Sequence, residues 1–238
     1  MNIGIMQPYF FPYLGYFDLI NSVDKWVVFD TAQYIYHGWI NRNRILHSKE
    51  GWQYIIVPLK KHPQNTQIMN IEIANDQKWK ERIFGQIQHY KKKSPYYDQT
   101  LNLIKSCLAI NESSISRLNT FILQNCCKTL NIQFDYSFFS EMDLELGQIE
   151  TPGDWALRIS EALGASEYIN PPGGVELFDP KKFEELNIKL TIRKFENIKY
   201  ECGNCEFIPD LSIIDVLMWN PASRIKEYLD TWNKHDKN

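Results

Sequence analysis

IGIMQPYFFPYLGYF, residues 3–17, is the stretch that decides the fold of this chain. Its first four residues predict a short buried strand. Pro8 and Pro12 then exclude a helix, because proline lacks an N–H donor and disfavours the helical region for the residue before it. We therefore expect a stiff aromatic loop that enters a helix near Leu14. Gln7 falls at the carboxyl end of the strand, where open α/β sheets bind ligands, and the helix-start amides that follow suit an anionic group.

Outward from this loop, the pattern is that of a βαβ unit. Apolar residues at helical spacing predict a helix over 14–23, and the nearly continuous apolar run at 25–30 predicts a strand covered on both faces, as in a parallel sheet. A polar and aromatic segment follows. Residues 52–58 (WQYIIVP) then predict a third strand, and the alternation at 68–73 (IMNIEI) predicts a half-exposed fourth strand.

The rest of the chain first turns helical and then returns to alternating strands and helices. Helices are predicted at 76–93, 96–107, 113–130, 151–163, 183–186 and 211–219, and strands at 132–138, 167–169 and 188–194. We therefore expect an α/β protein with a Rossmann-like, mostly parallel sheet and a helical insertion. Residues 1–75 would form the N-terminal Rossmann-like part, 76–130 the insertion, and 131–238 a C-terminal α/β part that completes the same domain or forms a second small one. The polar tail after Trp232 is expected to be frayed.

Composition limits the classes of partner and location. The 238 residues carry a net charge of −3, which gives no reason for binding to DNA or to a membrane surface. We recognise no signal peptide and no apolar run near the roughly 18 residues of a membrane-spanning helix, so we expect a cytoplasmic protein. The five cysteines suit reduced thiols in the cytosol. Cys202 and Cys205 form one C-x-x-C, but no second pair completes the four ligands of a structural zinc site, so we expect no metal.

Four segments place polar side chains or special backbone next to a predicted strand end. They are the double-proline loop at 7–13, the segment 30–44, the turn at 170–174 and the segment 207–215. Polar side chains at neighbouring strand ends are typical of a binding site in such a sheet. The candidate substrate-binding residues come from all four segments: Gln7, Tyr13, Gln33, Trp39, Asn41, Arg42, Asn43, Asn170, Gly173, Gly174 and Ser212.

The second segment contains the least usual motif, Trp-Ile-Asn-Arg-Asn at 39–43. Arg42 offers a planar fork suited to a carboxylate or phosphate, and the two asparagines offer hydrogen bonds without charge, as sugar hydroxyls require. A surface loop closed by a salt bridge is the alternative. His37 is a candidate general base, although a histidine in a mobile surface loop is equally expected. Asp30 is a candidate carboxylate facing the ligand, and Asp also commonly ends strands.

The last two segments have simple structural explanations beside a role in binding. Gly173 and Gly174 let a backbone approach a ligand closely, while a tight turn explains them equally well. Ser212 and Asp215 lie at helix-start spacing, which a variant of the capping box explains. The sequence contains no G-x-x-x-x-G-K-[ST], no G-x-G-x-x-G and no G-x-S-x-G, so the common phosphate-binding loops and the nucleophile elbow are not indicated.

Five stretches together resemble the WbqC-like family of bacterial proteins, which is found in gene sets for O-antigen and other surface polysaccharides. They are QPYFFPYLGYFDLI (7–20), FDTAQY (29–34), WINRNRI (39–45), LGASEYINPPGG (163–174) and FIPDLSIIDVL (207–217), in order along nearly the full chain. The resemblance implies a link to modified amino sugars and the attachment of an acyl or aminoacyl group, such as glycyl, to a sugar amine. It implies no particular catalytic residue.

A second similarity concerns architecture. A strand, a proline-containing loop and an aromatic helix start with a glycine look like the opening of nucleotidylyltransferases, whose helix begins with His-x-Gly-His. Here Tyr13-Leu14-Gly15-Tyr16 carries tyrosines in place of both histidines. Because the histidines of that superfamily stabilise charge on the transferred nucleotide, the similarity implies nucleotide binding more than adenylyl transfer.

We therefore expect a cytosolic transferase that acylates the amino group of a nucleotide-linked amino sugar in surface polysaccharide biosynthesis. Arg42 would hold a phosphate or carboxylate, and His37 or Asp30 would accept the proton of the attacking amine. Backbone N–H groups near Gln7 or Gly173 would stabilise the oxyanion. No permanently bound cofactor is expected, and the acyl donor would be coenzyme A, a carrier protein or an aminoacyl-tRNA.

Two alternatives stay open beside this transferase. One is a nucleotidylyltransferase-like enzyme that uses ATP and magnesium. The other is a non-catalytic sugar-nucleotide-binding or assembly protein of the same pathway. The sequence leaves the sugar, the donor and the oligomeric state undetermined.

Overall fold

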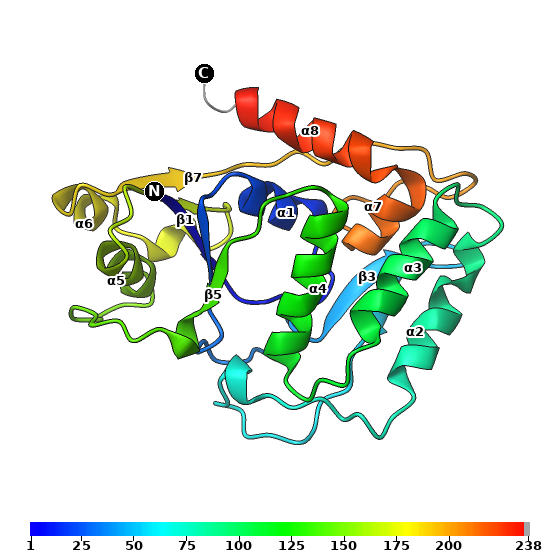
Figure 1. The fold of residues 1–238 in the computed structure, drawn as a ribbon, viewed down its shortest axis with the longest axis horizontal. Coiled ribbons are helices and arrows are strands. Elements are labelled where there is room, and N and C mark those ends of the chain that lie inside the picture. Colours follow the sequence, from blue (N-terminus) through cyan, green and yellow to red (C-terminus); the bar gives the residue numbers. More distant parts are fainter. Residues whose placement is uncertain (236–238) are drawn as a thin grey trace.

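A five-stranded parallel sheet forms the centre of the computed structural model, which describes residues 1–235 (Figure 1). Its strands, in spatial order, are β5 (Tyr136–Phe138), β2 (Lys25–Val28), β1 (Asn2–Met6), β6 (Glu167–Asn170) and β7 (Lys189–Ile192). All four neighbouring pairs are parallel. This arrangement confirms the predicted α/β class with a Rossmann-like parallel sheet.

The order of the strands fixes where a ligand is expected. From β1 the chain passes through helix α1 (Leu14–Asn21) to β2 and later to β5, which confirms the predicted βαβ unit. It then returns to the opposite side of β1 to form β6 and β7. The strand order therefore reverses between β1 and β6. In open α/β sheets the crevice at such a reversal, beyond the carboxyl ends of the strands, is where ligands bind.

Helices cover both faces of the sheet. Ile3, Ile5 and Val27 pack with helices α5 (Asp154–Ala162) and α6 (Pro180–Glu185), and these two helices lie on the left of Figure 1. The alternate residues of the same strands, such as Trp26 and Val28, belong to a larger core on the other side. That core also contains residues of α1 and of helix α8 (Ala222–His235), which runs along the top of Figure 1. Alternation along each strand thus divides the apolar side chains between two cores.

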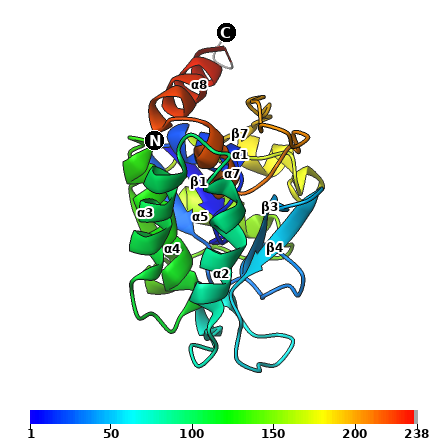
Figure 2. The ribbon, with the colours of Figure 1, turned by 90° about the vertical axis from the view of Figure 1, so that its right-hand side faces the viewer.

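A second group of elements packs beside the sheet and shares the larger core. It contains an antiparallel hairpin and four helices, with the hairpin beside α2 in Figure 2. These elements are β3 (Arg42–Leu46), β4 (Trp52–Ile56), α2 (Trp79–Ile87), α3 (Tyr97–Leu108), α4 (Ile115–Thr129) and α7 (Ile213–Trp219). Short 3-10 turns complete the described chain at Ile68–Asn70, Gln88–Tyr90, Phe139–Glu141 and Val175–Leu177.

Most predicted elements overlap the observed ones, and three predictions need correction. The strand predicted at 68–73 is wrong: Ile68–Asn70 is a 3-10 turn, and Glu72 and Ile73 make only isolated bridges. The polar and aromatic segment after residue 30, in which no strand is predicted, contains strand β3. The tail expected to fray after Trp232 is helical to His235, because Ile225 and Leu229 bury one face of α8, and residues 236–238 lie outside the described chain. The division into 1–75, 76–130 and 131–238 stays a prediction.

The double-proline loop is held in place by side chains distant in the sequence. Its backbone lacks the repeating hydrogen bonds of a helix or sheet, so its buried carbonyls need other donors. Asn43, which is 3% exposed, donates its side-chain amide to the carbonyls of Phe10 (3.0 Å) and Phe11 (2.9 Å). Its Oδ1 accepts from the backbone N–H of Arg44 at 2.8 Å. One buried asparagine thus joins strand β3 to the loop after β1.

Two further buried side chains complete this attachment. Asn119, on α4, donates to the carbonyls of Pro8 (2.8 Å) and Ile40 (2.7 Å). Ser212 donates its hydroxyl to the carbonyl of Phe11 at 2.7 Å, and its Oγ accepts from the first turn of α7. Both residues are fully buried. The loop, the hairpin, α4 and α7 are therefore positioned by one set of hydrogen bonds.

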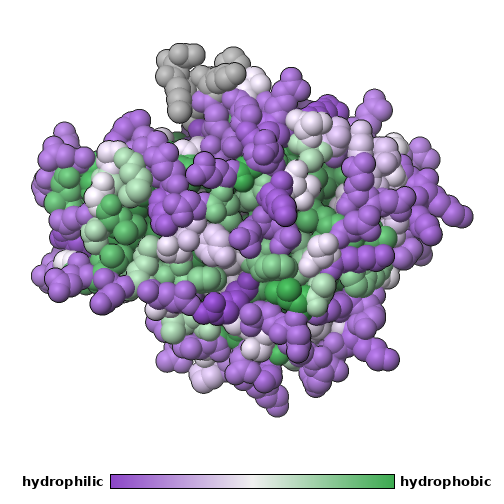
Figure 3. All heavy atoms as spheres, in the orientation of Figure 1, coloured by the Kyte–Doolittle hydropathy of each residue, from purple (hydrophilic) through white to green (hydrophobic). Residues whose placement is uncertain are grey.

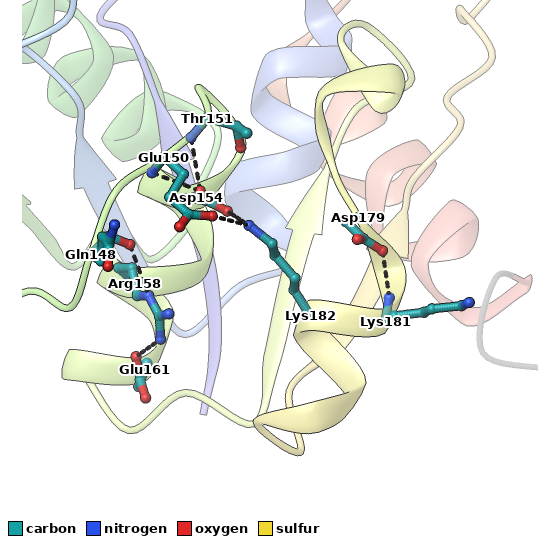
Figure 4. Close-up of polar contacts among 9 residues, drawn as sticks. All are labelled: Gln148, Glu150, Thr151, Asp154, Arg158, Glu161, Asp179, Lys181 and Lys182. Carbon is teal, nitrogen blue, oxygen red and sulfur yellow. Dashed lines mark hydrogen bonds and ion pairs between the residues drawn. The ribbon is translucent and has the colours of Figure 1, made fainter.

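A carboxylate at the start of α5 joins the two helices on the smaller core (Figure 4). Asp154 accepts from the backbone N–H groups of Glu150 (2.9 Å) and Thr151 (2.8 Å), and from the ammonium of Lys182 on α6 (2.8 Å). The Lys182 hydrogen bond is the main cause that holds the pKa of Asp154 well below its usual range. The ionised carboxylate therefore stabilises the contact between α5 and α6.

The molecular surface carries both hydrophobic and hydrophilic residues. Figure 3 shows hydrophobic residues in separate patches between hydrophilic ones on the face seen in Figure 1. Within residues 1–235, no helix combines the length and the apolarity needed to cross a bilayer.

Asn43→Ala should lower the free energy of unfolding by about 2–3 kcal/mol, because it leaves buried backbone groups of the loop and of β3 without their partner. Urea unfolding at pH 7 measures this difference. Asn102→Ala, at an exposed position of α3, is the matched control and should leave stability unchanged or slightly higher, since alanine favours a helix. Equal stability of Asn43→Ala and the wild type would contradict the structural role of this amide.

Asp154→Asn should flatten the acid side of the stability profile. The folded-state pKa of Asp154 is depressed, so the stability it contributes is present above the unfolded pKa of about 4 and is lost as pH falls toward the folded value. Urea unfolding at pH 7, 5, 4 and 3 should show a steeper loss of stability for the wild type than for the variant. The difference in slope is up to about 1.4 kcal/mol per pH unit. Asp143→Asn, an exposed loop control, should retain the wild-type slope.

Candidate functional site

A hollow of about 910 Å³ lies at the carboxyl ends of β1, β6 and β7. Met6 ends β1, Pro171 and Gly173 follow β6, and Arg193 follows β7, and all four line it. This is the sheet edge where the strand order reverses. The volume is in the range of small-molecule sites. We refer to it as the switch-point cavity.

Aromatic rings form much of the wall of the switch-point cavity. Tyr9 and Tyr13 come from the double-proline loop, Trp39 from the chain before β3, and Trp232 from α8. The ring of Tyr13 lies against Gly15, where an added Cβ would come within 2.4 Å of it. Glycine at this position is therefore what allows the ring to cover the start of α1.

The hydroxyl of Tyr13 remains protonated at neutral pH. Burial, and then the nearby carboxylate of Asp210, raise the pKa of Tyr13 to about 12. A neutral phenol can donate a hydrogen bond to an oxygen in the cavity. Tyr13 and the segment that carries Asp210 also meet through a bridge between Tyr13 and Ser212.

A buried ion pair lies in the wall of the switch-point cavity. Arg193 donates from Nη2 to Oδ1 of Asp18 at 2.9 Å and also binds the second carboxylate oxygen through Nε. Both side chains are at least nine-tenths buried, and Arg193 also contacts Asn233 of α8. The pair joins α1, the end of β7 and α8. Bidentate geometry of this kind fixes orientation as well as charge.

Charges of both signs complete the lining. Arg44 lies 5.3 Å from the ring centroids of Trp39 and Trp52, and its Nη2 donates to the carbonyl of Asp210 at 3.3 Å. Its Nε is buried and has no hydrogen-bond partner among residues 1–235. The Asp210 carboxylate accepts from Asn197 at 2.8 Å. The cavity can therefore offer a carboxylate, a guanidinium group and aromatic faces to one ligand.

A second, smaller hollow of about 450 Å³ is lined in part by the segment that leads into β3. Its cationic or titratable lining residues are His37, Arg42, Lys60, Lys61 and His62, and the others are Tyr34, Tyr36, Asn41, Ile56 and Leu59. We refer to it as the basic hollow. In the part of the chain that the structure describes, no aspartate or glutamate lines it.

The structure divides the sequence-predicted residues between the two hollows. Tyr13, Trp39, Asn43 and Gly173 line the switch-point cavity, whereas His37, Asn41 and Arg42 line the basic hollow. The aromatic loop and the tryptophan-asparagine-arginine stretch thus both contribute to the switch-point cavity, but Arg44 lines it in place of Arg42. Arg42 donates to the carbonyls of His37 and Gly38 and lies 4.2 Å from the ring centroid of Tyr54.

The other predicted residues line neither hollow. Asp30 is buried, and its two oxygens accept from the N–H (3.0 Å) and the hydroxyl (2.7 Å) of Ser140. Gln33 is exposed and donates to the carbonyl of Gln64 at 3.1 Å. Gln7 is half-buried, and its carbonyl accepts from the hydroxyl of Tyr16 at 2.8 Å.

The polar side chains in the turn after β6 and at the start of α7 form hydrogen bonds within the protein. Asn170 is buried and donates to the carbonyl of Pro171 at 2.7 Å, while its Oδ1 accepts from Tyr168. Gly174 has a φ of +81°, a backbone conformation that favours glycine. Ser212 caps α7, as its spacing predicts.

Sequence reasoning missed several residues of the cavity. Asp18 gave a signal, since it is a charged residue within the apolar run of the α1 helix. Asp210 lies inside the segment 207–215, where only Ser212 was selected. Arg193 and Trp232 lie in segments with no motif, and only the fold brings them to the cavity.

No cluster of three or more His, Cys, Asp or Glu side chains suited to a metal ion occurs within the described residues. Cys202 and Cys205 instead face each other across a short turn. Burial, followed by the nearby Asp215 carboxylate, raises the pKa of the Cys202 thiol to about 12. This thiol is therefore protonated at neutral pH.

Comparison with known proteins agrees with the resemblance of the five stretches. Residues 7–227 match the model of the WbqC-like protein family. A protein of Mycobacterium tuberculosis (strain ATCC 25618 / H37Rv), described as uncharacterized protein Rv1507c, is 26% identical over 230 residues, which cover 96% of this chain and 97% of that relative. No solved structure matches the chain significantly. With nearly its whole length matched, the chain belongs to the WbqC-like protein family.

Proposed function

We propose that this protein is a cytoplasmic transferase that attaches an acyl or aminoacyl group, such as glycyl, to the amino group of a nucleotide-linked amino sugar in surface polysaccharide biosynthesis. The observation that carries the proposal is the switch-point cavity, where aromatic rings, a carboxylate and hydrogen-bond donors meet at the carboxyl ends of the strands. Membership of the WbqC-like family supports the same function, because the resemblance to that family implies the attachment of an acyl or aminoacyl group to a sugar amine.

The cavity contains the groups that an amino sugar needs. Aromatic faces such as those of Trp39 and Tyr9 suit the apolar faces of a sugar ring, and polar groups at the edge suit its hydroxyls. A sugar ammonium must lose a proton before its nitrogen attacks. His37 and Asp30 lie off the lining, so we assign the proton acceptor to Asp210.

The neutral amine nitrogen attacks the acyl carbonyl carbon, and the carbonyl oxygen becomes an oxyanion. The Tyr13 hydroxyl, which stays protonated, and the guanidinium of Arg44 are the donors assigned to that oxyanion. The bond from the acyl carbon to the donor's sulfur or oxygen breaks, the proton held by Asp210 passes to this leaving group, and the second proton of the attacking nitrogen is released to water. The products are the amide and the free thiol or hydroxyl of the donor.

Asp210→Asn should lower the rate of transfer by about 100-fold or more, because an amide cannot accept the proton. The turn should survive, since Asp210 has a φ of +57° and asparagine tolerates this conformation as well as aspartate does. Mass spectrometry of UDP- and dTDP-linked amino sugars, incubated with acetyl-coenzyme A or with glycyl-tRNA, measures the acylated product. Glu206→Gln, an exposed neighbour off the lining, is the control and should react as the wild type.

Three outcomes would contradict the proposal. The first is an Asp210→Asn rate equal to that of the wild type. The second is a nucleotidylated product formed with ATP and magnesium in place of an acylated one. The third is binding of the sugar nucleotide without turnover under any donor, which would favour a binding or assembly protein of the same pathway.

A further inference from the structure

We propose that the basic hollow is a binding site for a nucleoside phosphate, which extends the proposed function by giving the phosphate part of one substrate its own place beside the switch-point cavity. Residues of one chain segment, 37–44, contribute to the linings of both the hollow and the cavity, and the two linings differ in charge. Carboxylates line the switch-point cavity together with cations, whereas the described lining of the basic hollow contains cations and no carboxylate.

The charge of the hollow is only partly neutralised. Lys60 forms an ion pair with Glu72 at 2.5 Å, outside the lining. Lys61 is exposed and makes no ion pair within residues 1–235, and the hydrogen bonds of Arg42 are to backbone carbonyls and to His37. A positive group left without a carboxylate partner next to a concave surface attracts an anion. Phosphate oxygens are among the anionic acceptors that arginine and lysine bind well.

Aromatic rings give the hollow a flat face for a nucleobase. The rings of Tyr36 and His62 are stacked, with centroids 5.2 Å apart and planes 15° apart. Tyr34 meets both rings edge to face, at 5.4 Å and 5.0 Å. Tyr36 is 51% exposed, so a large part of its surface remains available. Stacking of bases on such rings is a common source of affinity for nucleotides.

The walls of the hollow are organised before any ligand binds. The hydroxyl of Tyr34 donates to Asn41 at 2.9 Å, and the Asn41 amide donates to the carbonyl of Val57 at 3.0 Å. Arg42 holds the turn at His37, whose φ of +65° is uncommon for a residue other than glycine. A loop closed by these bonds loses less conformational freedom on binding than a mobile one.

The two hollows are close enough to serve one reaction. Arg42 faces the basic hollow and Arg44 faces the cavity, and their Cα atoms are at most about 7.6 Å apart along the chain. A phosphate held at Arg42 and Lys61 therefore leaves the reacting end of the same substrate, or of its partner, within reach of the cavity. The nucleoside phosphate could belong to the sugar acceptor, as a uridine or thymidine diphosphate, or to an acyl donor that carries an adenosine phosphate.

Calorimetric titration of the full chain with UDP, dTDP, ADP, uridine and adenosine tests this site without any turnover. At least one diphosphate should bind at about 50 mM salt, more tightly than the nucleosides without phosphate, and more weakly at about 300 mM salt. Preference for UDP or dTDP identifies the acceptor as the source, and preference for ADP identifies the donor. No binding by any of the three diphosphates would overturn the proposal.

Substitutions place the binding in the hollow. Lys61→Ala should weaken the diphosphate about three- to tenfold, because one charge-assisted contact is lost at an exposed position. Tyr36→Ala should weaken it as well, and Tyr36→Phe should restore binding, since the ring is retained. Lys92→Ala, an exposed lysine outside the hollow, should bind as the wild type.

These measurements distinguish failure of the nucleotide site from failure of the proposed acyl transfer. Diphosphate affinity that is unchanged in Lys61→Ala and Tyr36→Ala overturns the site, even if acyl transfer is observed. Diphosphate affinity that falls in these variants supports the site, even if no acyl transfer occurs. A loss of diphosphate binding in Asp210→Asn, with none in Lys61→Ala, would place the nucleotide in the cavity and overturn the proposal.

Discussion

The side-chain amide of Asn43 is the interaction on which the rest of this structure depends. A loop with prolines at positions 8 and 12 cannot satisfy its carbonyls through regular secondary structure, and it is buried between the sheet and the helices. Asn43 supplies donors to the carbonyls of Phe10 and Phe11, and Asn119 supplies one to Pro8. The requirement for these donors brings the hairpin and α4 against the end of β1, and one wall of the cavity results.

The hairpin also determines how charge is distributed around the site. Arg42 and Arg44 are two residues apart on β3, so they lie on the same face of the strand, opposite the buried Asn43. Each guanidinium packs on aromatic rings: Arg42 on Tyr54, and Arg44 between Trp39 and Trp52. Such packing holds a long side chain in one place while its charge stays available. The two arginines therefore present cations to two neighbouring hollows of different character.

The parallel sheet places the cavity, and a single ion pair sets its shape. Because the strand order reverses between β1 and β6, the loops after these strands diverge and leave room at their carboxyl ends. Asp18 and Arg193 then connect α1 to the chain after β7, so the segment that carries Lys194 and Glu196 stays at the edge of the opening. Burial of both partners makes the loss of either one costly, since the other charge would be left unpaired.

The sequence by itself determined the βαβ start, the parallel α/β class, the irregular double-proline loop and the family, because these follow from local patterns of apolar residues, prolines and motifs. Only the tertiary structure decided what each polar side chain does. Asn43 and Ser212, predicted to hold a substrate, hydrogen-bond the loop backbone, and Asp30 binds Ser140 110 residues away. Arg44 and Asp210 lie on the cavity although they are 166 residues apart. The reason is physical: a polar group acts on whatever the fold brings within hydrogen-bond distance, and sequence spacing does not specify that partner.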